Sequence, residues 1–271
     1  MTLNADKPFD PPKRLGVVSF LNARPLVEGL DAAPGIELTY DVPSRLPELL
    51  DTLRVDVALA PVINLARHPG EWEIVSDGCI GCDGETLTVR VFSRVRPAEI
   101  THLCVDGDSH TSVALAAVVW NEMYGTQLQI RPLQLDQPPS PSADEAVLLI
   151  GDKVVTRRPQ GFDHEIDLGE AWRNLTGLPF VFAAWTRRVG NDVGPLPQLL
   201  QKARDRGVAR AADIAREQGP AKGWPTEIAV RYLTEFLTFK LTPRHRTGLE
   251  LFLELAAKWG IVPRPTQSVF A

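Results

Sequence analysis

The stretch IELTYDVPSRLPELLDTLRVDVALAPV, residues 36–62, decides the fold class. It opens with apolar and polar side chains in alternation over residues 36–42, which predicts a strand. Ser44 then precedes a helical pattern in which four leucines share one face, so we expect Ser44 to cap a helix. Residues 55–62 form a continuous apolar run, which is typical of a strand buried on both faces. The stretch therefore predicts a β-α-β unit from a parallel sheet flanked by helices.

The alternation of strands and helices continues beyond this unit. Together the patterns predict two α/β units, the second inserted into the first and joined to it by two long connections. Gly125 ends one predicted helix, because glycine readily adopts the left-handed conformation of helix C-caps. Further strands are predicted at 14–20, 86–93, 102–106, 128–133, 145–152 and 179–188, and further helices at 113–125, 167–177, 195–218, 225–239 and 243–259.

This organisation predicts a two-lobe α/β protein with a ligand cleft between the lobes. The first lobe begins with residues 14–94, the second lobe is the insertion 95–186, and residues 187–271 complete the first lobe and supply the C-terminal helices. Proteins built in this way bind ligands at the C-terminal ends of their strands, and the two connections would act as a hinge. The plan indicates a binding architecture, but fold alone does not give the reaction.

The composition narrows the classes of partner. Of the 271 residues, 44% are hydrophobic and 23% are charged, as in ordinary globular proteins. A net charge of -5 argues against nucleic acid as a partner, although a small anion responds to local donors instead. No apolar run is long enough to cross a bilayer, and residues 1–15 lack the apolar core of a signal peptide. We therefore expect a cytoplasmic protein without a membrane partner; the oligomeric state stays open.

The three cysteines give no metal site. Cys79 and Cys82 form a C-x-x-C pattern, and Cys104 stands alone. A structural zinc site needs four ligands, usually as two close pairs. The glycines and aspartate around Cys82 predict a turn, whereas a thioredoxin-like site would open a helix. We therefore expect partly buried free thiols and no bound metal.

Polar residues stand at the end of the first predicted strand, in the order Ser19, Asn22 and Arg24. Asn22 either satisfies the backbone of a turn or contacts a ligand. Arg24, which precedes a proline, is either solvated or paired with a carboxylate. These residues fall at the edge of the sheet where the cleft is predicted, and they are candidates for substrate binding.

Other predicted strands deliver polar residues to the same edge. A period of two places Thr86, Thr88 and Arg90 on one face of their strand. Thr88 is either a β-branched strand residue or a ligand contact, and Arg90 indicates an ion pair. The strand over 145–152 ends in Gly151-Asp152, where Asp152 either caps the next segment or binds a ligand.

The sequence Ser109-His110-Thr111-Ser112 gives the strongest local signal. Its three hydroxyl groups meet unpaired backbone N–H groups at the start of a predicted helix, an end that favours a carboxylate or phosphate. The alternative is that one hydroxyl simply caps the helix. His110 is either a general base, kept neutral by the helix N-terminus, or an exposed spectator.

Several motifs of catalysis and nucleotide binding are missing. The sequence has no G-x-G-x-x-G, no P-loop, no H-E-x-x-H and no G-x-S-x-G pattern. The predicted cleft is neutral to mildly cationic, rich in hydroxyl and amide groups and poor in strong acids and bases. It suits a polar anionic ligand that both lobes hold by hydrogen bonds.

Seven segments follow one another between about residues 14 and 190: VSFLNARPL (18–26), DVPSRLPELL (41–50), VDVALAPV (55–62), CIGCDG (79–84), DSHTS (108–112), VLLIGD (147–152) and DLGEAWRNLTGLPFVFAAW (167–185). Together they resemble the chorismate dehydratases of the futalosine route to menaquinone, whose fold is similar to that of type II periplasmic binding proteins. The resemblance implies that chorismate loses water to give 3-[(1-carboxyvinyl)oxy]benzoate, without metal or organic cofactor.

The resemblance also implies roles for particular residues. Asn22 would contact the substrate near the reacting carbons, and Thr88 would be the second catalytic residue. The helix start at Ser109, Thr111 and Ser112 would bind a carboxylate. The same comparison implies a site role for Gly151 and Asp152.

No residue stands out as the general base. We therefore hypothesise that the enolpyruvyl carboxylate of the substrate removes the ring proton, while Asn22 positions it. Three other readings stay open: the enzyme of the same route that makes 1,4-dihydroxy-6-naphthoate, a non-catalytic protein that binds a small anion, and a ligand-sensing regulatory domain. A catalytic histidine, a transporter partner or a basic recognition helix, respectively, would favour them.

Overall fold

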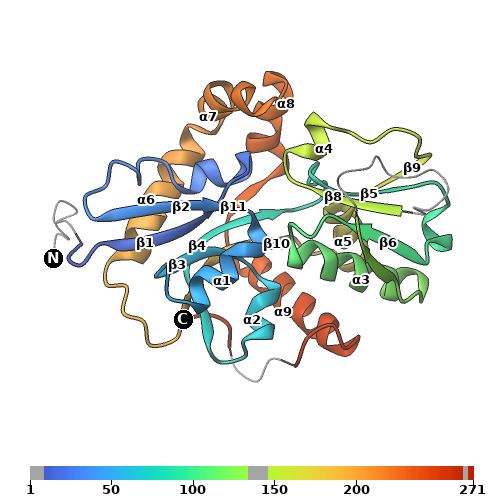
Figure 1. Ribbon diagram of the computed structural model, residues 1–271, viewed down its shortest axis with the longest axis horizontal. Coiled ribbons are helices and arrows are strands. Elements are labelled where there is room, and N and C mark those ends of the chain that lie inside the picture. The colour runs from blue at the N-terminus through green and yellow to red at the C-terminus, as the bar shows by residue number, and fades with distance from the viewer. Residues whose placement is uncertain (1–8, 134–145, 265–267) are drawn as a thin grey trace.

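The computed structural model describes residues 9–133, 146–264 and 268–271. Most of the N-terminal lead-in, residues 1–8, and the first residue of the predicted 145–152 strand lie outside the described residues. Within them the chain forms two sheets, each in its own lobe (Figure 1). The two-lobe α/β prediction is confirmed.

The first sheet has the strand order β11-β4-β10-β3-β1-β2. Strands β1, β2 and β3 are mutually parallel, as the opening stretch predicts, and β10 and β4 continue the sheet in antiparallel pairing. The strands β1 and β3 are buried almost throughout, which accounts for their unbroken apolar runs. The strand bounds are β1 Lys13–Val18, β2 Ile36–Asp41, β3 Val57–Pro61, β4 Trp72–Cys82, β10 Phe180–Arg188 and β11 Thr238–Lys240.

The second sheet has the strand order β7-β6-β8-β5-β9. Its central strand β8 is entirely buried and pairs in parallel with β6 and antiparallel with β5. The strand bounds are β5 Val89–Ser93, β6 His102–Val105, β7 Gln129–Pro132, β8 Ala146–Ile150 and β9 His164–Asp167.

Helices cover both sheets, and α9 packs against elements of both lobes, touching β10 and α3. Figure 1 shows α6, α7 and α8 over the first lobe and α3 and α5 beside the second sheet. Within the described ranges no helix is long and apolar enough to cross a membrane. The helix bounds are α1 Leu46–Asp51, α2 Ile63–Arg67, α3 His110–Tyr124, α4 Lys153–Thr156, α5 Leu168–Thr176, α6 Leu196–Ala209, α7 Ala211–Gln218, α8 Thr226–Arg231 and α9 Pro243–Lys258.

The helix of the opening stretch is shorter than predicted. A 3-10 turn at Pro43–Arg45 precedes α1, and the side chain of Ser44 does not cap it. Instead the Ser44 N–H donates to the carbonyl of Asp108 in the second lobe, at 3.0 Å. The helix ends early because Leu53 adopts a left-handed conformation, with φ of 56°. The predicted C-cap at Gly125 is confirmed, since that residue has φ of 66°.

The strands at the two lobe crossings belong to the opposite sheets from those predicted. We expected the 86–93 strand in the first lobe and the 179–188 strand at the end of the second. Instead β5 pairs with β8 and β9 in the second sheet, whereas β10 lies between β3 and β4 in the first. Both are long-range pairings, which local periodicity does not specify. The crossings therefore run from β4 to β5 and from α5 to β10.

The C-x-x-C segment is a strand and not the predicted turn. Cys79 and Cys82 lie within β4, and Gly81 permits its close pairing, since a Cβ there would come within 2.7 Å of the Phe180 carbonyl. Both thiols are free and fully buried, and burial raises the pKa of each above its usual value. The chain turns only after Cys82, at Gly84.

The predicted 225–239 helix divides into three pieces. Helix α8 ends at Arg231, one π-helical turn follows at Tyr232–Phe236, and strand β11 pairs antiparallel with β4. The predicted 195–218 helix is likewise divided, into α6 and α7. Tyr232, the first residue of the π-helical turn, is buried.

Candidate active site

A cleft lies between the lobes, at the ends of strands from both sheets, as predicted. Of the predicted site residues, Asn22, Thr88, Ser109, Ser112 and Gly151 line it. The complete lining consists of Val18, Phe20, Asn22, Pro43, Pro61, Ile80, Thr86, Thr88, Val89, Ser109, Ser112, Ile150, Gly151, Phe182, Ala183, Tyr232 and Leu237.

Three of these residues form what we call the hinge cluster: Asn22, Thr88 and Tyr232. The hydroxyl groups of Thr88 and Tyr232 are 2.7 Å apart and buried. Burial raises the pKa of the Tyr232 phenol above its usual value, and its hydrogen bonds with Thr88 and Asn22 oppose this shift. The Oδ1 atom of Asn22 is buried, and no described protein group donates a hydrogen bond to it. The cluster therefore offers neutral donors and acceptors to a ligand.

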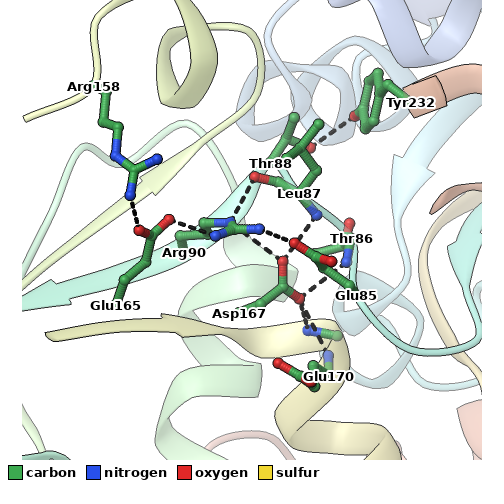
Figure 2. Close-up of polar contacts among 11 residues, drawn as sticks. Glu85, Thr86, Leu87, Thr88, Arg90, Arg158, Glu165, Asp167, Glu170 and Tyr232 are labelled. Atoms are coloured by element: carbon green, nitrogen blue, oxygen red, sulfur yellow. Dashed lines mark hydrogen bonds and ion pairs between the residues drawn. The ribbon is translucent and has the colours of Figure 1, made fainter. Parts of the chain in front are cut away.

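A strained turn brings Thr88 into the cleft. Its N–H donates to the Thr86 carbonyl at 2.7 Å, and Leu87 between them has φ of 65°. Such a turn is unfavourable for a branched residue and needs support from its surroundings. Asp167 supplies it, because its carboxylate accepts hydrogen bonds from the N–H groups of Thr86 at 3.0 Å and Leu87 at 2.8 Å (Figure 2).

Asp167 also begins α5, where it accepts hydrogen bonds from the N–H groups of Gly169 and Glu170. Burial raises the pKa of Asp167 to about 6, while the backbone donors and Arg90 favour its ionised form. One side chain thus joins the crossing segment before β5 to the helix after β9.

Arg90 belongs to this support and not to the cleft lining. Figure 2 shows its guanidinium among Glu85, Glu165 and Asp167, with which it forms ion pairs. Its Nε also donates to the Leu87 carbonyl at 2.9 Å. The predicted ion pairing of Arg90 is confirmed, and its charge is committed to holding the turn.

The start of α3 presents two of its three hydroxyl groups to the cleft. Ser109 caps the helix, since its Oγ accepts the N–H of Ser112 at 3.2 Å, and the two Oγ atoms are 3.0 Å apart. Thr111 instead accepts the N–H of Ile63 in the first lobe, at 3.3 Å. The capping role of Ser109 is therefore confirmed, whereas the binding of an anion by this segment stays a prediction.

His110 also contacts the other lobe. Its Nδ1 lies 3.4 Å from the Nδ2 of Asn64, and it is not part of the cleft lining. Burial, followed by the charge of Arg67, lowers the pKa of His110 below its usual value. The imidazole is thus neutral near pH 7, as a base would be, but it faces a protein amide.

Asp152 also contacts the other lobe. Its Oδ1 accepts the N–H of Leu21 at 3.2 Å, and its Oδ2 lies 3.9 Å from the ammonium of Lys222. Burial raises the pKa of Asp152, while these two donors oppose that shift. We call the pairs Asp152–Leu21, His110–Asn64 and Thr111–Ile63 the rim contacts.

Ser19 and Arg24 lie near the cleft but do not line it. The carbonyl of Ser19 accepts a hydrogen bond from Lys222 at 2.7 Å. The guanidinium of Arg24 stacks over the ring of Tyr40, 4.5 Å from its centroid. The structure thus gives both residues protein partners, and their predicted substrate contacts stay predictions.

Tyr232 is the site residue that sequence reasoning missed. It falls inside a predicted helix without any motif, and its partner Thr88 is 144 positions away. Only the folded arrangement brings the two together.

The structure gives no candidate metal site: no three His, Cys, Asp or Glu side chains among the described residues lie close enough to share an ion.

Chorismate dehydratases of two organisms are similar to this chain over most of its length. The chain is 27% identical to the chorismate dehydratase of Thermus thermophilus, covering 90% of this chain and 94% of that protein. It is 25% identical to the chorismate dehydratase of Campylobacter jejuni, covering 87% and 89%.

The similarity to solved structures concerns the fold alone. A protein of Archaeoglobus fulgidus superimposes with a TM-score of 0.71 at 15% identity, covering 92% of this chain and 98% of that one. The periplasmic aliphatic sulphonate binding protein of Escherichia coli does so with 0.63 at 11%, covering 94% of each. The fold is therefore of the periplasmic-binding-protein kind. A sequence model described as menaquinone biosynthesis matches residues 13–258, and the chain accordingly belongs to this family.

Proposed function

We propose that the protein is a chorismate dehydratase, which removes water from chorismate to give 3-[(1-carboxyvinyl)oxy]benzoate. The observation that carries the proposal is the hinge cluster, which brings Asn22 and Thr88 together in a cleft without carboxylate or imidazole among its described lining residues. The dehydratases of two other organisms, similar over most of the chain, support the assignment.

The cleft suits a carboxylate group attached to an unsaturated ring. Ser109 and Ser112 stand at the N-terminus of the 15-residue helix α3, where backbone N–H groups and the helix dipole favour a carboxylate. The rings of Phe20 and Phe182 line the same space. Apolar walls of this kind exclude water and strengthen the hydrogen bonds within the cleft.

The proton has no evident acceptor among the lining residues that the structure describes. Tyr232 stays protonated, because burial raises its pKa. We therefore assign the proton to the enolpyruvyl carboxylate of the substrate. The ring C–H bond beside the ether breaks, the ring C–O bond to the hydroxyl breaks, and the proton passes to the departing oxygen. One water leaves, and the ring becomes aromatic, which makes the step strongly favourable.

Incubation of the purified protein with chorismate tests the proposal. We expect one water to be lost from chorismate, with the aromatic product detected by mass spectrometry and by its ultraviolet spectrum. The Asn22→Ala variant serves as the matched control for contaminating activity. If chorismate binds but persists, the protein is a small-anion binder, and the dehydratase assignment is wrong.

A further inference from the structure

Tyr232 contacts a predicted catalytic residue from an unexpected element. Its hydroxyl is 2.7 Å from the Thr88 Oγ1, and its ring stacks on Trp224 with the centroids 4.8 Å apart and the planes at 18°. It begins the π-helical turn at Tyr232–Phe236, and such turns frequently occur at functional sites. The stacking and the wide turn fix the ring, so the phenol has a defined direction.

The direction of the hydrogen bond between the two hydroxyl groups follows from their acidity. A phenol is more acidic than an aliphatic alcohol, so it is the better donor, and the alcohol oxygen is the better acceptor. Burial raises the pKa of Tyr232 and keeps its proton in place. When Tyr232 donates, the Thr88 proton is left for another acceptor. No described protein group besides Tyr232 bonds to the Thr88 Oγ1, and Thr88 lines the cleft.

We propose that Tyr232 is a positioning residue, which donates to Thr88 and thereby turns the Thr88 hydroxyl into a donor toward the leaving hydroxyl of the substrate. The inference rests on the proposed dehydratase function. An O–H group that accepts a hydrogen bond becomes a stronger donor. Thr88 then stabilises the negative charge that develops on the departing oxygen, and its own O–H bond stays intact.

The Tyr232→Phe variant tests this role, because it keeps the ring on Trp224 and removes only the phenol oxygen. We expect kcat for chorismate to fall by about 10- to 100-fold with little change in KM, a smaller loss than for removing a donor that contacts the charge itself. Tyr124→Phe is the matched control, since Tyr124 packs on Trp120 in α3, away from the cleft lining. It should keep wild-type kcat.

A double-mutant cycle separates positioning from an independent effect. If Tyr232 acts through Thr88, then Tyr232→Phe combined with Thr88→Val has the same kcat as Thr88→Val alone, within about twofold. Multiplied losses would overturn the proposal, as would wild-type kcat in Tyr232→Phe. Thr88→Ser, which keeps the hydroxyl, should restore most of the activity lost in Thr88→Val.

Fluorotyrosine gives a test that does not depend on the folding of Tyr232→Phe. The chain has three tyrosines, so replacement of all three by 3-fluorotyrosine is practicable. A more acidic phenol is a stronger donor and a weaker acceptor, so kcat should equal or exceed that of the wild type. A fall of roughly fivefold or more would show that Tyr232 accepts instead. Absence of turnover in the wild-type protein would overturn the dehydratase assignment together with this role, whereas an active wild type with indifferent variants overturns the role alone.

Discussion

The hinge cluster and the rim contacts differ in the chemistry of their side chains. Asn22, Thr88 and Tyr232 are neutral and line the cleft. Asp152 and His110 are titratable, and they bond to protein groups of the other lobe. The difference indicates that the rim contacts bind one lobe to the other, whereas the amide and hydroxyl groups of the hinge cluster face the ligand space. Substitutions in the two sets should therefore change different parameters, kcat for the first and KM for the second.

Asn22→Ala should have the largest effect on the reaction. Removal of a preorganised group at the reacting atoms typically costs about 10²- to 10³-fold in kcat, and we expect such a loss with a nearly unchanged KM. Asn174→Ala is the matched control, because Asn174 is exposed on α5. Steady-state kinetics with chorismate measure both. Near wild-type turnover with unchanged affinity would remove Asn22 from the catalytic machinery.

Gly151→Ala should affect both sets, because Gly151 lines the cleft beside Asp152. Its φ is 72°, and an added Cβ would lie 2.7 Å from the ring of Phe20. We expect about 1–3 kcal/mol of lost stability from backbone strain and overpacking, with kcat/KM lowered as Phe20 moves.

Gly161→Ala separates the two causes of the Gly151 effect. Gly161 has φ of 78°, but nothing lies within 4 Å of an added Cβ. It should therefore lose only the roughly 1 kcal/mol of backbone strain and keep its kcat/KM. Thermal unfolding and kinetics of both variants give the comparison; equal values of kcat/KM would show that Phe20 does not shape the cleft.

Asp152→Asn sharpens the assignment of the rim contacts. The amide keeps an oxygen for the Leu21 N–H but loses the charge that faces Lys222 at 3.9 Å. Closure of the lobes should weaken by about 1 kcal/mol, so we expect KM to rise about fivefold while kcat is retained. Asp163→Asn, an exposed change in the same lobe, should leave both unchanged. A fall in kcat alone would instead place Asp152 in the chemistry.

Local patterns predicted the elements of the fold and several residues of the cleft. The β-α-β unit, the C-cap at Gly125 and the hydroxyl groups at Ser109 and Ser112 follow from signals within a few residues of each other. Such signals report which segments are strands or helices and which residues stand at their ends. These signals therefore predicted the two-lobe architecture and the position of Asn22 at the cleft.

Local sequence patterns did not predict the features that depend on long-range pairing. The sheet to which β5 and β10 belong depends on their partners, and so does the strand conformation of Cys79 and Cys82. Tyr232 reaches Thr88 only after the first lobe is completed by the C-terminal third of the chain. Thr111 and Asp152 both follow strand ends, and in the structure both bond to backbone groups of the other lobe. Their predicted substrate contacts stay predictions.

The pH dependence of stability should show the smallest effect, and it concerns the rim contact of His110. Burial lowers the pKa of His110 in the folded protein below the ordinary value of 6.5. At this residue the unfolded chain binds more protons below that pH, so the contribution of His110 to the free energy of unfolding falls as the pH decreases from 6.5 toward the folded pKa. His110→Asn should remove this contribution in denaturant titrations between pH 5 and 7. The remaining slope combines a contribution of the same sign from His245, whose pKa burial also lowers, with one of opposite sign from Asp167, whose pKa burial raises to about 6. An unchanged slope would mean that His110 accepts a proton in the folded state, and that it is not held neutral against Asn64.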